Sequence, residues 1–361
     1  MLTSYLKLSL RLLARNPFFT FINVAGLSVG FAVFFILWQY SQSELKSDQQ
    51  WKDWGRIVRC GFIWEGTDDN VHWSKGQFGH HMPEIVNRVF GDFEEIESLT
   101  RIFIQENFVL EHIPFHDKNI SLTFINERDE RVSFKETSVA YADPNLFEFF
   151  SIPLLKGNKK NVLQEANSIV LSESMVLKYF GKIDPMNQIL LVNNEIPLKV
   201  TGVFADLPQN THLEFNAAIS TRGIHKYIDQ PQLALGGPHS YFNLRPGVQP
   251  SVLEAKINHV GITYWQIPAN LVEKVRIAFY LQPLKDVAFN NYRTDFFKPK
   301  SPFLLRTLSG ISVLILLVAW INYIQLSTSF FRKRLKEIGV RKTNGARGRD
   351  FTLQFLLESL L

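Results

Sequence analysis

The chain has 361 residues, of which 46% are hydrophobic and 20% are charged, with a formal net charge of +5 and one cysteine. A single cysteine cannot close a disulfide within the chain, so any large domain must depend on its own apolar core. The positive excess lies at the two ends, because residues 18–331 carry slightly more acidic than basic side chains. This distribution excludes a nucleic-acid-binding surface on the main body of the protein.

The first predicted element is an uncharged apolar helix at residues 18–40. A cleaved signal peptide is the alternative, but its apolar region spans only about 7–15 residues and ends in a small-x-small site. This segment is longer and ends at Trp38 and Tyr40, which are typical of a membrane interface. Residues 1–17 carry three basic side chains and no acidic one, so we predict a retained transmembrane helix with a cytoplasmic N-terminus.

Within this helix, Gly26-Leu27-Ser28-Val29-Gly30 fits two motifs. Gly-x-Ser-x-Gly is the nucleophile elbow of hydrolases, but that elbow requires a preceding strand. Gly-x-x-x-Gly allows close packing of membrane helices. The apolar helical context favours the second interpretation, so Gly26 and Gly30 are predicted to pack against another helix.

Residues 41–302 are predicted to form one large extracytoplasmic domain of the α+β class. Its clearest elements are strands at 167–172, 198–204 and 274–281, a helix at 173–180 that stops at Gly181, and a helix that opens at Pro250 or Ser251 and runs towards His259. No repeat of 20–50 residues and no low-complexity tract is present.

Candidate chemical groups in this domain are weak. His72, His80 and His81 with Glu84 could ligate a metal, but no His-Glu-x-x-His motif or cysteine pair accompanies them, so we expect surface residues. The acidic groups Asp68-Asp69, Glu94-Glu95 and Glu127 to Glu130 are expected to be solvated.

No catalytic residue is predicted anywhere in the chain. Gly-x-x-x-x-Gly-Lys-[Ser/Thr] does not occur, and Phe180-Gly181-Lys182-Ile183 lacks both the first glycine and the hydroxyl. No Ser/His/Asp or Cys/His set has helpful local context. We therefore expect a non-enzyme that binds no cofactor and no metal itself.

The second predicted transmembrane helix covers residues 303–331. Its uncharged part, Thr307 to Phe331, exceeds the ~20 residues that span a bilayer, although Asn322, Tyr323 and Gln325 are polar. A buried core helix of this length would normally show a charged face. Because basic residues dominate the segment that follows, both chain ends are predicted to be cytoplasmic and the large domain to be outside.

Residues 332–350 form a basic cytoplasmic segment, and residues 351–361 resemble the opening of a third transmembrane helix. Basic residues beside a membrane bind anionic lipids and fix topology, at about 1 kcal/mol each. The last 11 residues are too few to cross a bilayer, so we expect the chain to be a fragment or a truncated reading frame.

Three motifs in order resemble the MacB-like periplasmic core domain of ABC transporter permeases. They are Tyr141–Gly157, Ser168–Glu173 with Lys178–Gly181, and Val200–His212. Ala319–Thr328 and Arg334–Ala346 are similar to the start of an FtsX-like permease domain, and Asn23-Val24-Ala25-Gly26-Leu27 resembles a pattern in large permeases of Bacteroidetes-type bacteria.

The resemblance implies a permease subunit in the bacterial inner membrane that exports or extracts a substrate. It implies a homodimer or heterodimer with a second permease, a separate ABC ATPase that holds ATP and Mg, membrane lipids around the spans and a periplasmic adaptor or outer-membrane partner. It also implies that a helix after the second span docks on the ATPase. The residues assigned to this coupling are Arg334, Lys336, Glu337, Ile338, Gly339, Arg341, Lys342 and Gly345.

A different class of function is also open at this stage. A membrane-anchored sensor or interaction protein would use the large domain for binding and would have no transport cycle. Such a sensor normally carries a cytoplasmic signalling domain after its last span, where this chain shows a short basic segment. No sequence feature marks a substrate pocket.

Overall fold

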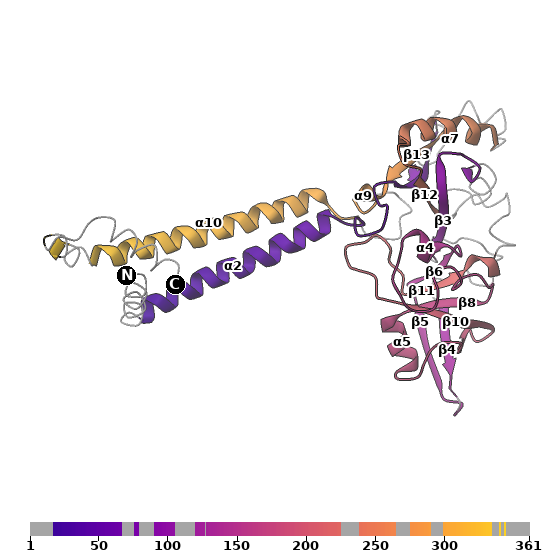
Figure 1. Ribbon diagram of the computed structural model, residues 1–361, viewed down its shortest axis with the longest axis horizontal. Helices are drawn as coiled ribbons and strands as arrows, with labels where there is room; N and C mark the ends of the chain where they lie inside the picture. The colour runs from indigo at the N-terminus through magenta and orange to yellow at the C-terminus, as the bar shows by residue number, and fades with distance from the viewer. Residues whose placement is uncertain are drawn as a thin grey trace. The chain divides into compact units, whose positions relative to one another are not determined.

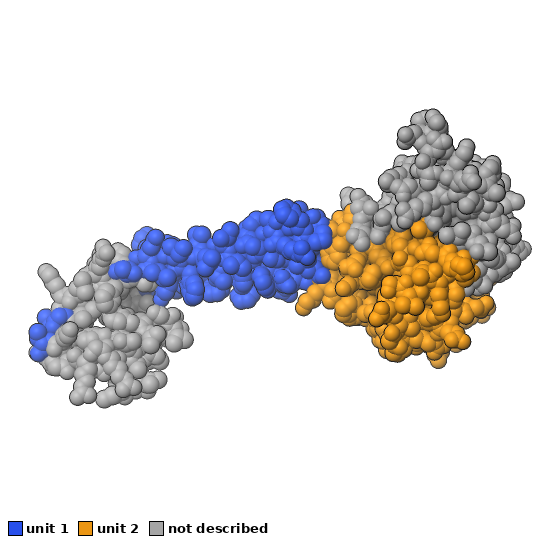
Figure 2. Space-filling view, turned by 90° about the horizontal axis from the view of Figure 1, so that it is seen from above, with its two compact units in different colours: residues 1–45, 301–361 blue, residues 46–300 orange. Residues whose placement is uncertain are grey.

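The structure is a computed structural model that describes residues 17–66, 76–78, 90–104, 120–126, 128–224, 238–264, 275–289, 299–333, 339–340 and 343. The chain divides into two compact units, coloured separately in Figure 2. Unit 1 consists of residues 1–45 with 301–361, and unit 2 consists of residues 46–300. Unit 2 is therefore a domain inserted between the two helical segments of unit 1.

Unit 1 contains two long apolar helices that lie side by side, α2 (Pro17–Leu45) and α10 (Pro302–Lys333) (Figure 1). Each contains a stretch that is long and apolar enough to cross a membrane, at Thr20–Leu45 and Pro302–Leu326. Only 6% and 11% of their most apolar windows are buried, whereas the core helix of a soluble protein would be mostly buried. Both predicted spans lie within these helices.

Unit 2 is built on one mixed sheet with the strand order β13-β1-β12-β3-β6-β11-β8-β10-β9-β4-β5, and with β2 beside β1 and β7 beside β10. The β6–β11 and β8–β10 pairs are parallel, and the other described pairs are antiparallel. The strands are β1 (Ile57–Gly66), β2 (Gly76–Phe78), β3 (Ile96–Ile104), β4 (Ile120–Ile125), β5 (Arg131–Glu136), β6 (Val139–Ala142), β7 (Leu154–Lys156), β8 (Ser168–Ser172), β9 (Ile189–Val192), β10 (Ile196–Phe204), β11 (Ala217–Ser220), β12 (His239–Leu244) and β13 (Val275–Pro283).

Short helices accompany this sheet. They are α4 (Leu146–Phe149), α5 (Glu173–Phe180), the 3-10 helix η3 (Thr221–Gly223), α7 (Pro250–Tyr264) and α9 (Leu284–Val287). The mixture confirms the α+β class. The predicted strands appear as β8, β10 and β13, and the predicted helices as α5 and α7.

Helix α5 shows why local signals predicted its bounds. The Ser172 side chain accepts a hydrogen bond from the Met175 amide, which satisfies one donor at the start of the helix. Gly181 ends the helix with a φ of 58°, a conformation that most residues with a Cβ avoid. Both signals lie within a few residues of the helix itself.

The core of unit 2 is rich in phenylalanine. The fully buried rings include Phe90, Phe103, Phe147, Phe150, Phe204, Phe242 and Phe279. Strands β6, β8, β11 and β12 are buried along their whole length, which explains the mostly apolar sequences of β6, β8 and β11, whereas β12 also buries His239, Ser240 and Asn243. The single cysteine, Cys60, lies inside this core, and burial raises the pKa of its thiol, so it is protonated and unreactive at neutral pH.

Candidate functional site

The two predicted packing glycines lie on the face of α2 that contacts α10. A Cβ built on Gly30 would lie 2.5 Å from the Cβ of Ala319, and one built on Gly26 would lie 3.7 Å from Nδ2 of Asn322. The helices therefore approach most closely at Gly30. Ser28 lies within the helix and follows no strand, so the structural context of a hydrolase nucleophile is missing. The role of both glycines in a membrane stays a prediction.

The predicted coupling segment lies almost entirely outside the described residues. Gly339 is described and is exposed. The other seven residues assigned to coupling lie outside the described residues, namely Arg334, Lys336, Glu337, Ile338, Arg341, Lys342 and Gly345. Their contact with an ATPase stays a prediction.

The weak metal candidates also fall outside the structure, since His72, His80, His81 and Glu84 are not described. Across the residues that the structure does describe, no group of three or more His, Cys, Asp or Glu side chains could hold a metal ion. Of the acidic groups, Glu94 is exposed and Glu95 forms an ion pair with Lys256.

Asp48, which follows shortly after the end of α2, is a buried polar group with several hydrogen-bond partners in unit 2. Its side chain is fully buried, and Oδ1 accepts hydrogen bonds from Thr211 Oγ1 (2.5 Å), the His212 amide (3.1 Å) and Trp51 Nε1 (3.2 Å). The same oxygen lies 2.9 Å from His212 Nδ1. A buried carboxylate needs such partners, because it has lost its hydration.

Two opposing effects set the pKa of Asp48. Burial raises it, but the charge of His212 together with hydrogen bonds from His212 and Thr211 outweighs burial. The pKa of Asp48 is therefore lower than its ordinary value, and the side chain is ionised at neutral pH.

His212 connects Asp48 to strand β12 of the sheet. Its Nε2 lies 2.8 Å from Oη of Tyr241, a buried residue of β12. The ring of Phe150 packs edge-on against both Tyr241 and Trp51. The Asp48–His212 pair is consequently embedded in aromatic packing and excluded from water.

Lys300, at the C-terminal end of unit 2, bonds to residues that lie close to Asp48 and His212 in the sequence. Lys300 Nζ donates to Ser47 Oγ (3.0 Å) and to the carbonyl oxygen of Gln209 (3.4 Å), and its amide donates to the carbonyl of Ala288 (2.8 Å). The first and last residues of the inserted domain therefore meet at residues 206–212, which we call the junction loop.

The junction loop is also fixed at its first residue. Asp206 Oδ1 accepts from the amide (3.1 Å) and the hydroxyl (2.8 Å) of Ser174 at the start of α5. Burial raises the pKa of Asp206, but the hydrogen bonds from Ser174 and Ser172 together lower it by more than burial raises it. The pKa of Asp206 therefore lies below its ordinary value. Asp206 thus serves as a capping residue for α5.

The first resembling motif has a structural role as well. Asp143 accepts two side-chain hydrogen bonds from Arg101, at 2.9 and 3.0 Å, and a third from Thr221 at 2.9 Å. The side-chain Nδ2 of Asn145 donates to the carbonyl oxygen of Leu99 (2.7 Å). This motif joins β3, β6 and η3, so its polar residues stabilise the fold.

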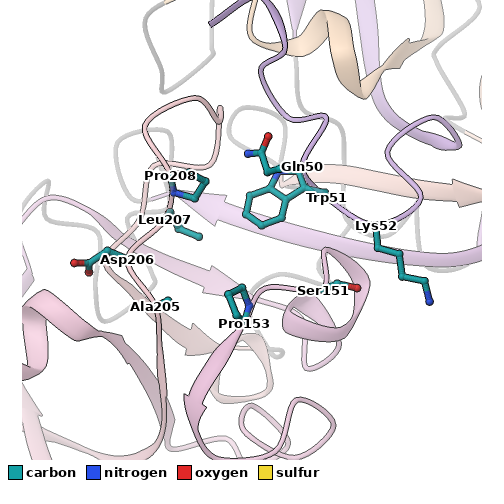
Figure 3. Close-up of a pocket in the computed structure, with 9 residues that line it drawn as sticks. All are labelled: Gln50, Trp51, Lys52, Ser151, Pro153, Ala205, Asp206, Leu207 and Pro208. Carbon is teal, nitrogen blue, oxygen red and sulfur yellow. The ribbon is translucent and has the colours of Figure 1, made fainter. Parts of the chain in front are cut away.

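A cavity of about 400 Å³ adjoins the junction loop (Figure 3). It is lined by Gln50, Trp51, Lys52, Ser151, Pro153, Ala205, Asp206, Leu207 and Pro208. Figure 3 shows the indole of Trp51 facing Leu207 and Pro208, whereas the charged ends of Lys52 and Asp206 point away from the middle of the cavity. The lining offers apolar contact and no paired nucleophile and base.

No local sequence pattern predicted the Asp48–His212 pair, because its members are separated by 164 positions. A usable signal was nevertheless present. His212 ends the third resembling motif, and Asp48 is among the first acidic residues after the first apolar helix.

Two protein-family profiles match the chain. The MacB-like periplasmic core domain matches residues 20–260, and the FtsX-like permease C-terminal region matches residues 309–361. The first match covers more than half of the chain. Together the two matches include both long apolar helices and most of unit 2.

Two bacterial proteins are similar over more than half of the chain. The macrolide export ATP-binding/permease protein MacB of Agrobacterium fabrum is 24% identical over 234 residues, which cover 62% of this chain and 33% of that protein. The syringafactin export ATP-binding/permease protein SyfD of Pseudomonas syringae is 26% identical over 212 residues, which cover 56% of this chain and 29% of that protein. The chain spans about a third of the length of these relatives.

A solved structure shares the fold. The crystal structure of a domain assigned to a permease protein from Porphyromonas gingivalis aligns with a TM-score of 0.51 at 19% identity, covering 71% of this chain and 98% of that domain. At this identity the likeness concerns the fold alone. It agrees with the sheet and helices of unit 2.

Proposed function

The chain belongs to the family of permeases with a MacB-like periplasmic core domain, and from this membership we propose that it is the permease subunit of an ABC transporter whose ATPase is a separate chain. The observation that carries the proposal is the insertion of one core domain between two apolar helices, each long enough to cross a membrane. The names of both relatives combine an ATP-binding and a permease part, whereas this sequence holds no Gly-x-x-x-x-Gly-Lys-[Ser/Thr] motif.

In this proposal the protein lies in the bacterial inner membrane with its N-terminus in the cytoplasm and unit 2 in the periplasm. The charge distribution supports this orientation, since residues 1–17 and 332–350 are basic and unit 2 is not. The segment from Arg332 to Arg347 docks on the ATPase, which holds ATP and Mg. The permease forms a dimer with a second copy or a second permease.

The cargo that we propose is a large amphiphilic compound, which is exported or extracted through movement of the periplasmic domain. The names of the two relatives, which mention a macrolide and syringafactin, support this class. Closure of two ATPase subunits would tilt the membrane helices and shift the periplasmic domain as a rigid body. A periplasmic adaptor or outer-membrane partner would receive the cargo.

Purification of the protein from native membranes tests this function. The tagged chain, extracted in mild detergent, should carry along an ABC ATPase encoded beside it, in a fixed ratio and with ATPase activity. Recovery of the permease without any ATPase subunit, from membranes that contain that ATPase, would contradict the proposal and favour a sensor or interaction protein.

A further inference from the structure

The chain passes from unit 1 to unit 2 after residue 45 and returns before residue 301, and we call these two points the passages. Bonded residues of unit 2 lie beside each passage in the sequence. After α2 ends at Leu45, Ser47 and Asp48 are both buried. Before α10 begins at Pro302, Lys300 is fixed through its own amide to Ala288.

The two passages are also bonded to each other. Lys300 Nζ donates to Ser47 Oγ at 3.0 Å, which joins the last residue of unit 2 to one of its first. The same ammonium group donates to the carbonyl of Gln209 at 3.4 Å, and the Asp48 amide donates to the carbonyl of Asn210 at 3.1 Å. Both passages are therefore held on the junction loop.

The junction loop is itself immobilised from two sides. Asp206 is bonded to the start of α5 through Ser174, and His212 is bonded to β12 through Tyr241. Between these points, Thr211 and His212 hold the carboxylate of Asp48 without contact with water. Bonds of this kind, charge-assisted and buried, are strong and geometrically specific.

We propose that the junction loop, with Asp48 and Lys300, is a clamp that keeps the two passages together and prevents the outer ends of α2 and α10 from separating. Its contribution to transport rests on the proposed function: the clamp would keep the outer ends of α2 and α10 paired while the membrane helices move. The clamp itself requires no ATPase and can be measured in the isolated full chain.

Spin labels at the two ends of the helix pair test the clamp. The outer pair is Tyr40→Cys with Leu304→Cys, and the inner pair is Phe21→Cys with Ile324→Cys, all four being exposed positions. Cys60 is buried with its thiol protonated, so only the introduced cysteines should be labelled. Dipolar broadening of the EPR spectrum is recorded for the full chain in lipid nanodiscs.

We expect strong broadening for both pairs in the otherwise unchanged chain. Lys300→Ala and Asp48→Asn should each lose the broadening of the outer pair and keep that of the inner pair. Lys300→Arg, which retains a cationic donor, should keep both. Lys285→Ala, which removes an exposed lysine of α9, is the matched control and should also keep both.

Unchanged broadening of the outer pair in Lys300→Ala and Asp48→Asn would overturn the clamp. Loss of broadening in both pairs would overturn it too, because the effect would then not be specific to the outer ends. A clamp found in a protein that purifies without an ATPase would leave the clamp standing and contradict the proposed function alone.

Discussion

At the scale of single residues, Asp48 is a buried carboxylate that needs hydrogen-bond donors from the protein in place of water. It is ionised, fully buried and bonded by Thr211, His212 and Trp51. A buried carboxylate in this position is not a large net source of stability, because it has lost its hydration. Removal of one partner, however, leaves the other buried without compensation.

We therefore predict that Asp48→Ala lowers the free energy of unfolding of the periplasmic domain by about 3–5 kcal/mol. The comparison is with Asp184→Asn, which breaks the exposed ion pair between Lys156 and Asp184 and should leave the unfolding midpoint nearly unchanged. Urea unfolding of residues 46–300, followed by tryptophan fluorescence, measures both. Equal midpoints for the two variants would contradict the assignment.

The lowered pKa of Asp48 also predicts a pH dependence. A carboxylate whose pKa is lower in the folded state contributes stability that is fully present above its ordinary value of 3.8 and is lost as the pH falls through the folded pKa. Asp48→Asn cannot titrate at this position. The difference in unfolding free energy between the natural chain and Asp48→Asn should shrink from about pH 5 to about pH 2, and a constant difference would contradict the prediction.

At the scale of elements, a helix or strand was predicted correctly where the residues that determine it lie close to it in the sequence. Helix α5 was predicted with its bounds because Ser172 and Gly181 lie at its ends. Strand β12 was not predicted, because His239–Leu244 is buried at every residue and shows no alternation between apolar and polar side chains. The bonding of the junction loop was not predicted, since its partners Asp48, Ser174 and Lys300 are distant in sequence.

The packing of α2 on α10 yields a prediction that separates its two glycines. Gly30→Ala places a methyl group 2.5 Å from the Cβ of Ala319 and should destabilise the helix pair by about 1–3 kcal/mol, as overpacking does. Gly26→Ala gains only an ordinary contact at 3.7 Å and should have little effect.

The partner residue supplies the control for this prediction. Ala319→Gly removes the methyl group that Gly30→Ala would meet, so the double variant should recover the thermal midpoint of the natural chain in detergent. If Gly30→Ala is harmless, or if Ala319→Gly fails to rescue it, the close contact at this position is wrong.

At the scale of the whole molecule, charge and hydropathy along the chain predicted the division into a helical membrane part and one inserted domain. The structure confirms two long apolar helices that flank a compact α+β unit in the sequence. What charge and hydropathy could not provide was the bonding of Ser47 and Asp48 with Lys300, because such contacts depend on the completed fold.

The proposed orientation predicts which cysteines can be labelled from the periplasm. Leu177→Cys, at an exposed position of α5, should react with a membrane-impermeant maleimide in spheroplasts. The natural chain should remain unlabelled, because Cys60 is buried and protonated. Labelling of Leu177→Cys only after lysis would place unit 2 in the cytoplasm and contradict the orientation.

The most direct test of the central claim, that this permease acts on a separate ATPase, is the ATPase rate of the complex in proteoliposomes. We predict that the natural chain stimulates its ATPase and that Glu337→Lys combined with Gly339→Trp inserts normally but abolishes this stimulation. Lys285→Glu, a charge reversal at an exposed site of unit 2, should leave it intact. Stimulation by the double variant equal to that by the natural chain would contradict the claim that residues 332–347 couple the permease to the ATPase.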